Sequence, residues 1–344
     1  MARDRVLLTG ISGFIAGHVA LRLLEAGYDV RGTVRGLDKA DAVRRLLAAA
    51  GADIDRLSLF AADLTDAVGW MEAASGCRYV LHTASPFPAS PPSDRHALVP
   101  AAVDGTLRVM AAAERAGAER VVLTSSAAAI YSAHPPRPGE SYGEADWSDT
   151  QSPDISAYAL SKTLAERAAW DAARDAGLDL VAINPALVLG PLLGAGAAGG
   201  EGTSAALIRA VMGGRMPVVP DLAFALADVR DVADAHLAAM TAPSASGRRF
   251  ALSSGTLSLI EIGKVVGEAC PGEARRLPRW TLPDRVVRLA AILSAQARAA
   301  VPELGRRKSL DTTPARDILG LSARSPEDAV AAMAQSIAQL PRTA

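Results

Sequence analysis

The chain has 344 residues, half of them apolar, and a formal net charge of −1 at neutral pH. This length allows one sizeable core with a smaller appended lobe, and the absence of a basic stripe argues against a dedicated nucleic-acid binder. Cys77 and Cys270 lie far apart without CxxC spacing, and the five histidines show no grouping typical of a metal site, so we expect no disulfide, no metal and a reducing cytoplasm.

The chain begins with a strand–turn–helix pattern. Residues 5–8 are apolar, residues 9–17 contain three glycines, and residues 18–26 are apolar at helical spacing before Gly27. Glycines in such a loop bring backbone amides and a helix N-terminus against a pyrophosphate, although similar turns also serve ordinary strand–helix packing. We predict a dinucleotide site that includes Gly10, Ser12, Gly13, Phe14 and Ile15.

The second strand indicates which dinucleotide is bound. Residues 29–35 end in Arg35, where an NAD-binding fold usually carries an acidic residue for the ribose hydroxyls. Asp38 comes only in the following turn. We therefore expect Arg35, with Lys39 nearby, to bind the 2′-phosphate of NADP(H), which favours NADP(H) while leaving NAD(H) possible. The alternative is that both are solvated surface cations.

Apolar runs then alternate with alanine-rich helical stretches. The runs cover residues 57–61, 78–86, 120–126 and 178–185. Nearly continuous apolar strands indicate a parallel sheet covered on both faces, so the predicted class is α/β with a Rossmann-type doubly wound sheet. Small or polar residues end each run, at the edge where ligands of such sheets bind.

A tyrosine–lysine pair follows the run at 120–126. The chain has five tyrosines and four lysines, so random placement would give only about 0.06 Tyr-x-x-x-Lys pairs, yet Tyr158 and Lys162 form one. On a helix, residues four apart share a face. An ammonium group there would lower the pKa of the phenol, so that Tyr158 could donate a proton near neutral pH.

The later sequence predicts a small, mostly helical substrate-binding lobe. Helical periodicity covers residues 257–269, 283–299 and 326–339. We assign residues 1–190 and roughly 222–252 to the dinucleotide-binding domain, and residues 191–221 and 253–344 to the lobe. The glycine-rich stretch 192–202 is either a mobile loop near the nicotinamide or a plain flexible connection. Candidate pocket walls, each explained better by ordinary packing, are Phe87, Pro88, Tyr131 and Trp147.

Together these motifs resemble the extended short-chain dehydrogenases/reductases, in the branch of dihydroflavonol reductases, cinnamoyl-CoA reductases and microbial aldehyde or ketone reductases. The resemblance covers roughly the first 240 residues. It rests on residues 9–17, 33–35, 63–64, 82–86, 124–126, 158–162, 184–185 and 229–236. It implies that Asp63 and Leu64 flank the adenine. It also implies that Thr83, Ala84 and Ser85 line the central part of the cofactor and that Pro185 to Val188 border the nicotinamide.

The resemblance also implies a catalytic set of Ser126, Tyr158 and Lys162, with Ser125 as the alternative serine. Tyr158 would act as general acid, Lys162 would lower its pKa and bond the ribose hydroxyls, and Ser126 would polarise the carbonyl. The expected activity is reversible NADP(H)-dependent reduction of an aldehyde or ketone to the alcohol. Two departures are Ala16, where many relatives have glycine, and Tyr131, where the plant flavonoid branch tends to carry asparagine, which argues against a dihydroflavonol substrate.

Other functions stay open at this point. A nucleotide-sugar epimerase or dehydratase would favour NAD and would commonly add an acidic residue near the serine, but no Asp or Glu follows Ser126 before Glu140. A non-catalytic dinucleotide sensor would not need an intact catalytic set, and a 3β-hydroxysteroid-type dehydrogenase is a variant of the reductase.

The expected partner is a small carbonyl or alcohol substrate, with no nucleic acid and no membrane. No membrane span is expected, because the longest apolar stretch, residues 178–200, contains Asn184, Pro185 and Pro191. The chain would act as a monomer or a homodimer.

Overall fold

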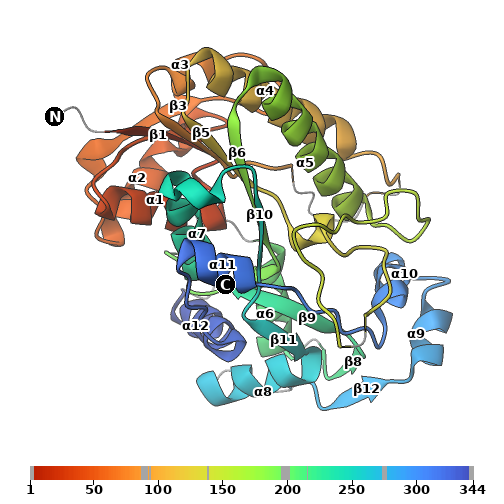
Figure 1. Ribbon diagram of the computed structural model, residues 1–344. Helices are drawn as coiled ribbons and strands as arrows, with labels where there is room; N and C mark the ends of the chain where they lie inside the picture. Colours follow the sequence, from red (N-terminus) through yellow and green to blue (C-terminus); the bar gives the residue numbers. More distant parts are fainter. Residues whose placement is uncertain are drawn as a thin grey trace.

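The computed structural model describes residues 4–86, 92, 94–137, 139–194, 202–214, 216–272 and 277–340. At its centre lies a seven-stranded parallel sheet with the strand order β10-β6-β5-β4-β1-β2-β3 (Figure 1). The strands are β1 (Arg5–Thr9), β2 (Asp29–Val34), β3 (Leu57–Ala61), β4 (Tyr79–His82), β5 (Arg120–Thr124), β6 (Asp179–Pro185) and β10 (Arg249–Leu252). The predicted Rossmann-type fold is confirmed.

Helices cover both faces of the sheet because its strands are apolar on both sides. One face carries α1 (Phe14–Glu25), α2 (Ala40–Ala49) and α7 (Val229–Thr241), and the other carries α3 (Trp70–Ala74), α4 (Val99–Arg115) and α5 (Ala157–Ala176). In β1, Val6 and Leu8 pack into the first core cluster and Leu7 into the second. This alternation follows from successive side chains pointing to opposite faces of a strand.

A third core lies below the sheet in Figure 1. It packs α6 (Thr203–Met212), α8 (Leu259–Ala269) and α12 (Pro326–Gln339) against a small sheet of the order β11-β9-β7. These strands are β7 (Leu187–Leu189), β9 (Ala223–Asp228) and β11 (Gly255–Ser258), while β8 (Val218–Pro220) pairs with β12 (Trp280–Leu282). A lobe with its own core therefore follows the dinucleotide-binding fold.

The structure refines the predicted helices of the lobe. Residues 326–339 form α12 as predicted. The helix predicted at 283–299 is two helices, α9 (Asp284–Ala290) and α10 (Ala295–Ala300), because the Ser294 side chain accepts a hydrogen bond from the Ala297 amide and caps a new start. The helix predicted at 257–269 begins at Leu259, where Ser258 and Glu261 form a capping box.

One segment assigned to the lobe lies against the first core. Helix α11 (Thr313–Leu319) packs on α7 and β10, and its Ala315 and Leu319 are buried in the core that α1 and α2 share. The division into two domains at the predicted boundaries stays a prediction.

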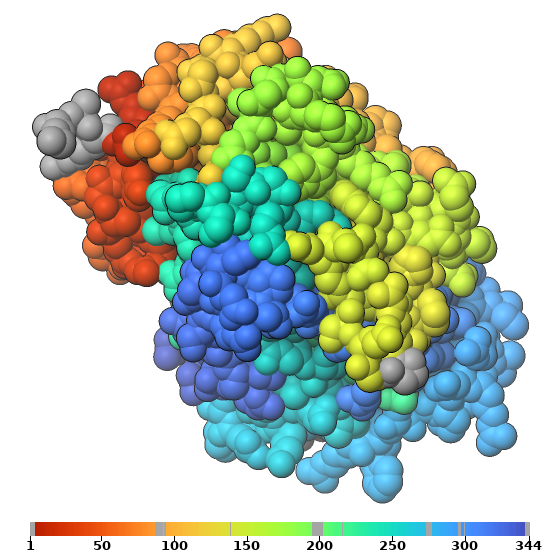
Figure 2. All heavy atoms as spheres, viewed as in Figure 1, coloured from red at the N-terminus to blue at the C-terminus, as the bar shows by residue number. Residues whose placement is uncertain are grey.

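The segment between β5 and α5 reaches across to the C-terminal part of the chain. The Tyr142 amide donates to the Ser309 carbonyl at 2.9 Å, and the Asp311 amide donates to the Tyr142 carbonyl at 2.8 Å. Figure 2 shows this segment in yellow, beside the blue C-terminal part. Residues that follow Ser126, the predicted catalytic serine, are thereby tied to the lobe.

Candidate membrane spans and candidate metal centres are both absent from the described residues. Within them, no helix combines the length and the apolar character that crossing a membrane needs. The same residues hold no cluster of three or more metal-ligating side chains. Both cysteines are buried, and neither forms a disulfide among the described residues.

Candidate active site

The glycine loop between β1 and α1 packs tightly against the end of β4. Gly10 has a φ of +67°, in the left-handed region that favours glycine, and a Cβ there would lie 3.0 Å from Cα and Cβ of Ala84. The Ala84 amide donates to Oγ1 of Thr9 at 3.0 Å, and the Thr83 hydroxyl donates to the Thr9 carbonyl at 2.5 Å. The predicted cofactor segments 10–15 and 83–85 therefore lie together.

The start of α1 suits a pyrophosphate. Its N-cap residue, Gly13, has no side chain to bond the amides of the first turn, so these amides and the positive end of the helix dipole are left for an anion. Ser12, Phe14 and Ile15 are half-buried around this point. The cradle that a Cβ at Gly10 would fill, and the uncapped helix start, fit a dinucleotide.

The predicted adenosine end lies beyond β2 and β3. Arg35 is exposed directly after β2, and Lys39 ends a short 3-10 turn that follows. Hydrogen bonds from the amide and hydroxyl of Thr65 lower the pKa of Asp63, and the charge of Arg35 lowers it further, so Arg35 and Asp63 are neighbours. Leu64 packs on α4, where a Cβ at Gly105 would come within 2.8 Å of it.

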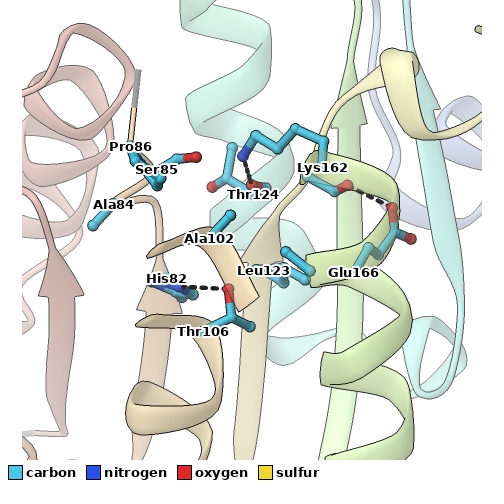
Figure 3. A pocket seen from close by; sticks show the side chains of 12 residues that line it. His82, Ala84, Ser85, Pro86, Ala102, Thr106, Leu123, Thr124, Lys162 and Glu166 are labelled. Carbon is cyan, nitrogen blue, oxygen red and sulfur yellow. Dashed lines mark hydrogen bonds between the residues drawn. The ribbon is translucent and has the colours of Figure 1, made fainter. Parts of the chain in front are cut away.

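The predicted catalytic residues meet at the ends of β5 and α5. Tyr158 lies in the first turn of α5, which Ser156 caps by accepting a hydrogen bond from the Ala159 amide. One turn later, the buried Lys162 donates from Nζ to the Thr124 carbonyl at 3.1 Å (Figure 3). The Ser126 hydroxyl, just past β5, lies beside the Tyr158 hydroxyl.

The two adjacent serines face different partners. Ser126 caps a short 3-10 turn, accepting a hydrogen bond from the Ala128 amide at 3.1 Å, and meets Tyr158. Ser125 is buried and donates to Oε2 of Glu166 at 2.5 Å. Of the two hydroxyls, that of Ser126 lies beside the phenol.

The pKa of Tyr158 is raised, contrary to the prediction that Lys162 lowers it. Burial raises the pKa of Tyr158, and the hydrogen bond with Ser126 offsets only part of that rise. Burial also lowers the pKa of Lys162 to about 8, against the opposing charge of Glu166. Desolvation disfavours the charged form of both groups, and neither group is among the causes of the other's pKa shift.

A small pocket joins the two halves of the site. It is lined by Ala84 and Ser85 from the cofactor side and by Lys162 and Glu166 from α5, with His82 between them (Figure 3). Pro185 ends β6 and Val188 lies in β7, both buried on the far side of β5. Pro185 thus ends a strand of the central sheet, whereas Val188 belongs to the small sheet of β11, β9 and β7.

The predicted wall residues differ in their surroundings. Tyr131 is near Tyr158, burial raises its pKa to about 12, and Lys308 lies 5.4 Å from its ring centre. The guanidinium carbons of Arg249 and Arg167 lie 3.7 Å and 5.0 Å from the ring centre of Trp147, so this side chain has a packing role. Phe87 and Pro88 lie outside the described residues.

The start of the glycine-rich stretch lies over the dinucleotide-binding helices. Leu193 contacts Gly17 of α1, and Gly194 lies beside Leu46 of α2. The remainder of the stretch, residues 195–201, is outside the described residues, so its closure over substrate stays a prediction.

Sequence reasoning missed two buried charged residues beside the predicted catalytic set, Glu166 and Arg249. Glu166 accepts hydrogen bonds from Asn184 and Arg249, at 2.8 Å and 2.5 Å. One signal was available, because Glu166 follows Lys162 by four residues and so extends the Tyr158–Lys162 face of the helix. Arg249 had none, since its partner lies 83 residues away in the sequence.

Because two histidines are buried, we expect the free energy of unfolding to fall at acid pH. The Nδ1–H of His236 donates to the Val232 carbonyl at 2.7 Å, and its Nε2 accepts from the Thr124 hydroxyl at 2.6 Å, so the ring is neutral. Burial lowers the pKa of His236 to about 4 and that of His82 to about 3. Unfolded histidine titrates near ~6.5, so the unfolded chain binds more protons below that pH.

Stability is therefore complete above about pH 6.5 and falls as the pH drops towards the folded values, by about 2 kcal/mol per histidine near pH 5. Thermal unfolding at about pH 7.5 and about pH 5 measures the difference. His236→Asn should flatten this dependence, whereas His96→Gln, at an exposed position, should not. An equal melting temperature at both pH values would contradict the prediction.

Comparisons with known proteins agree with this geometry. A family model described as the NAD dependent epimerase/dehydratase family matches residues 6–252. The cinnamoyl-CoA reductase CAD2 of Medicago truncatula is 37% identical over 287 residues, which cover 81% of this chain and 84% of the relative.

Solved structures are similar over nearly the whole chain. Yeast methylglyoxal/isovaleraldehyde reductase Gre2, complexed with NADPH, matches with a TM-score of 0.78 and 25% identity, over 97% of this chain and 98% of its own. Gre2 of Candida albicans, in complex with NADPH, matches with a TM-score of 0.79 and 28% identity, over 97% and 98%.

Proposed function

Because the chain belongs to the NAD dependent epimerase/dehydratase family, as an extended short-chain dehydrogenase/reductase, and is an NADP-dependent oxidoreductase, we propose that it reduces the carbonyl group of an aldehyde or ketone. The observation that carries this proposal is the arrangement of Ser126, Tyr158 and Lys162 at the end of β5 and the start of α5, with Lys162 anchored on the Thr124 carbonyl at 3.1 Å. It places two hydroxyl donors at the carboxyl edge of the sheet, beside the residues that suit a dinucleotide.

The cofactor residues have separate roles in the proposal. The loop at Gly10 and Gly13 and the start of α1 hold the pyrophosphate. Arg35 and Lys39 bind the 2′-phosphate, and Thr83 to Ser85 contact the middle of the cofactor. Pro185 and Val188 border the nicotinamide. NADPH, when bound, supplies the hydride.

The chain's own residues manage the proton. Negative charge builds on the carbonyl oxygen as the carbonyl carbon is reduced, and the Ser126 hydroxyl donates a hydrogen bond to that oxygen. The Tyr158 hydroxyl donates its proton to the same oxygen as general acid. Its raised pKa keeps the phenol protonated at neutral pH. Lys162, anchored by the Thr124 carbonyl, provides a positive charge near the phenolate that remains.

A substrate panel tests the function. We expect steady NADPH oxidation with at least one aldehyde or ketone, no net oxidation with a nucleotide sugar, and slower turnover with NADH. The measurement is the decrease in NADPH absorbance, with product identified by mass spectrometry. Epimerisation of a nucleotide sugar without net cofactor use, together with no turnover of any carbonyl compound, would overturn the proposal.

A further inference from the structure

A buried carboxylate lies directly behind the catalytic residues. The Glu166 side chain is 0% exposed. Its Oε1 accepts from Nε of Arg249 at 2.5 Å and from the Trp170 indole at 3.3 Å. Its Oε2 accepts from the Ser125 hydroxyl at 2.5 Å, from Nδ2 of Asn184 at 2.8 Å and from a second Arg249 nitrogen at 3.3 Å. Five donors therefore converge on one carboxylate.

Arg249 is equally enclosed. Its side chain is 6% exposed, and its third nitrogen donates to the carbonyls of Glu144 at 2.9 Å and Asp146 at 2.6 Å. The ring of Trp147 covers the guanidinium at 3.7 Å. Moving both charges out of water costs free energy that their attraction often does not repay, so an apolar pair of equal volume would commonly be as stable. The ion pair is therefore poorly explained by stability alone.

The carboxylate fixes the backbone on both sides of Ser126. Ser125 precedes Ser126 directly and is held by Glu166. Asn184 bonds Glu166 and also donates to the Ser126 carbonyl at 3.2 Å. Its Oδ1 is buried without a hydrogen-bond partner among the described residues, an imperfection that native structures seldom keep without a reason. Both contacts of Glu166 thus lead to the serine beside Tyr158.

The same carboxylate faces Lys162. Glu166 follows Lys162 by one helical turn, and of the described residues that line the pocket in Figure 3 it alone carries a carboxylate. The other titratable group facing Lys162 across this pocket is His82 on β4, which burial keeps neutral, while Tyr158 lies one turn earlier on α5. Arg249 lies behind Glu166, on β10.

We propose that Glu166, held by Arg249, is a positioning residue for carbonyl reduction: it fixes Ser126 through Ser125 and Asn184 and places a negative charge one helical turn from Lys162. This inference rests on the proposed function of the site. The position of the carboxylate and its charge can be separated by substitution, because Glu166→Asp keeps the charge on a shorter side chain and Glu166→Gln keeps the length without the charge.

The two substitutions are expected to differ in their effects. Glu166→Asp withdraws the carboxylate from Ser125 and Asn184, so kcat should fall about 10- to 100-fold. In this variant the fall of kcat/KM at alkaline pH, which reports loss of the Lys162 charge, should stay near pH 8. In Glu166→Gln the carboxylate charge no longer opposes the lowering of the Lys162 pKa by burial. The fall of kcat/KM at alkaline pH should therefore move at least about one unit to lower pH.

A matched control lies at the opposite end of β5 and β6, the two strands that end near Ser125 and Asn184. Arg120, which begins β5, pairs with Asp179 at the start of β6 at 2.6 Å, with the arginine side chain 9% exposed. Asp179→Asn breaks a comparable ion pair away from the catalytic residues. We expect it to lower the melting temperature while leaving kcat and the pH profile of kcat/KM unchanged.

A direct titration makes the test independent of turnover. With only four lysines in the chain, selective 13C labelling gives four resolvable side-chain signals, and Lys162→Met assigns the one of interest. The Lys162 pKa should lie near 8 in the wild type and in Glu166→Asp, and lower in Glu166→Gln. If the Glu166→Gln variant is too unstable to titrate, the double substitution Glu166→Gln with Arg249→Met takes its place, because it removes both buried charges together.

The outcomes separate the two proposals. An unchanged Lys162 titration in Glu166→Gln, or wild-type kcat in a folded Glu166→Asp, overturns the role of Glu166 even in an active reductase. A shifted titration in a protein that reduces no carbonyl compound instead overturns the proposed function and leaves the electrostatic link intact. A purely structural role would lower the melting temperature of both variants and move neither pH measurement.

Discussion

Replacing Tyr158 with phenylalanine is expected to lower kcat for carbonyl reduction by at least about 10²-fold. The substitution removes only the hydroxyl, so the half-buried ring keeps its packing in the first turn of α5. What is lost is the proton for the carbonyl oxygen and the contact of the phenol with the Ser126 hydroxyl. The Kd for NADPH should stay within a few-fold, because Lys162 and the glycine loop are untouched. Stopped-flow turnover and a fluorescence titration with NADPH measure the two quantities.

Tyr142→Phe is the matched control for this substitution. The Tyr142 side chain is buried, and its hydroxyl donates to the carbonyl of the exposed Pro135 at 2.6 Å. Removing this hydroxyl deletes one hydrogen bond and should cost about 0.5–1.5 kcal/mol of stability, with kcat close to that of the wild type. A Tyr158→Phe protein that reduces a good substrate within a few-fold of the wild-type rate would show that Tyr158 is not the proton donor.

The fold followed from local pattern to an unusual degree. Each run of apolar residues that the sequence marked as a strand lies in the seven-stranded sheet, and β3 has the predicted bounds of 57–61. The reason is physical, since strands buried on both faces must be apolar throughout and the helices between them cannot be. The Tyr158–Lys162 pair was equally readable, because helical spacing alone places residues four apart on one face.

What depended on tertiary packing was not readable. The helix predicted at 283–299 is interrupted because Ser294 caps a second helix. The sequence alone does not distinguish a serine inside a helix from a serine that caps one. The direction of the Tyr158 pKa was wrong because it depends on burial, which the sequence does not give. Arg249 meets Glu166 only because β10 pairs with β6 at the edge of the sheet, a long-range pairing with no local signal.

Substitution of Arg35 by serine should raise the KM for NADPH about 10- to 100-fold. A guanidinium that bonds the 2′-phosphate contributes charge-assisted hydrogen bonds, which are stronger than neutral ones. NADH lacks this phosphate, so its KM should change less than about 3-fold, and the preference between the two cofactors should narrow or reverse. Arg35 is exposed after β2 and beside Asp63, so its loss removes no core contact and the melting temperature should hold.

Two control substitutions bracket the prediction. Lys39→Ser removes the second cation of the predicted clamp and should raise the KM for NADPH by less, because an ammonium bonds phosphate through a single point charge. Arg174→Ser removes an arginine whose side chain is 71% exposed, near the far end of α5, and should leave both cofactors unaffected. An equal loss of NADPH and NADH affinity in Arg35→Ser would mean that this arginine supports the fold of the adenosine site. Arg35 would then not bind the 2′-phosphate, and other residues at the edge of β2 and β3 would determine the preference for NADPH over NADH.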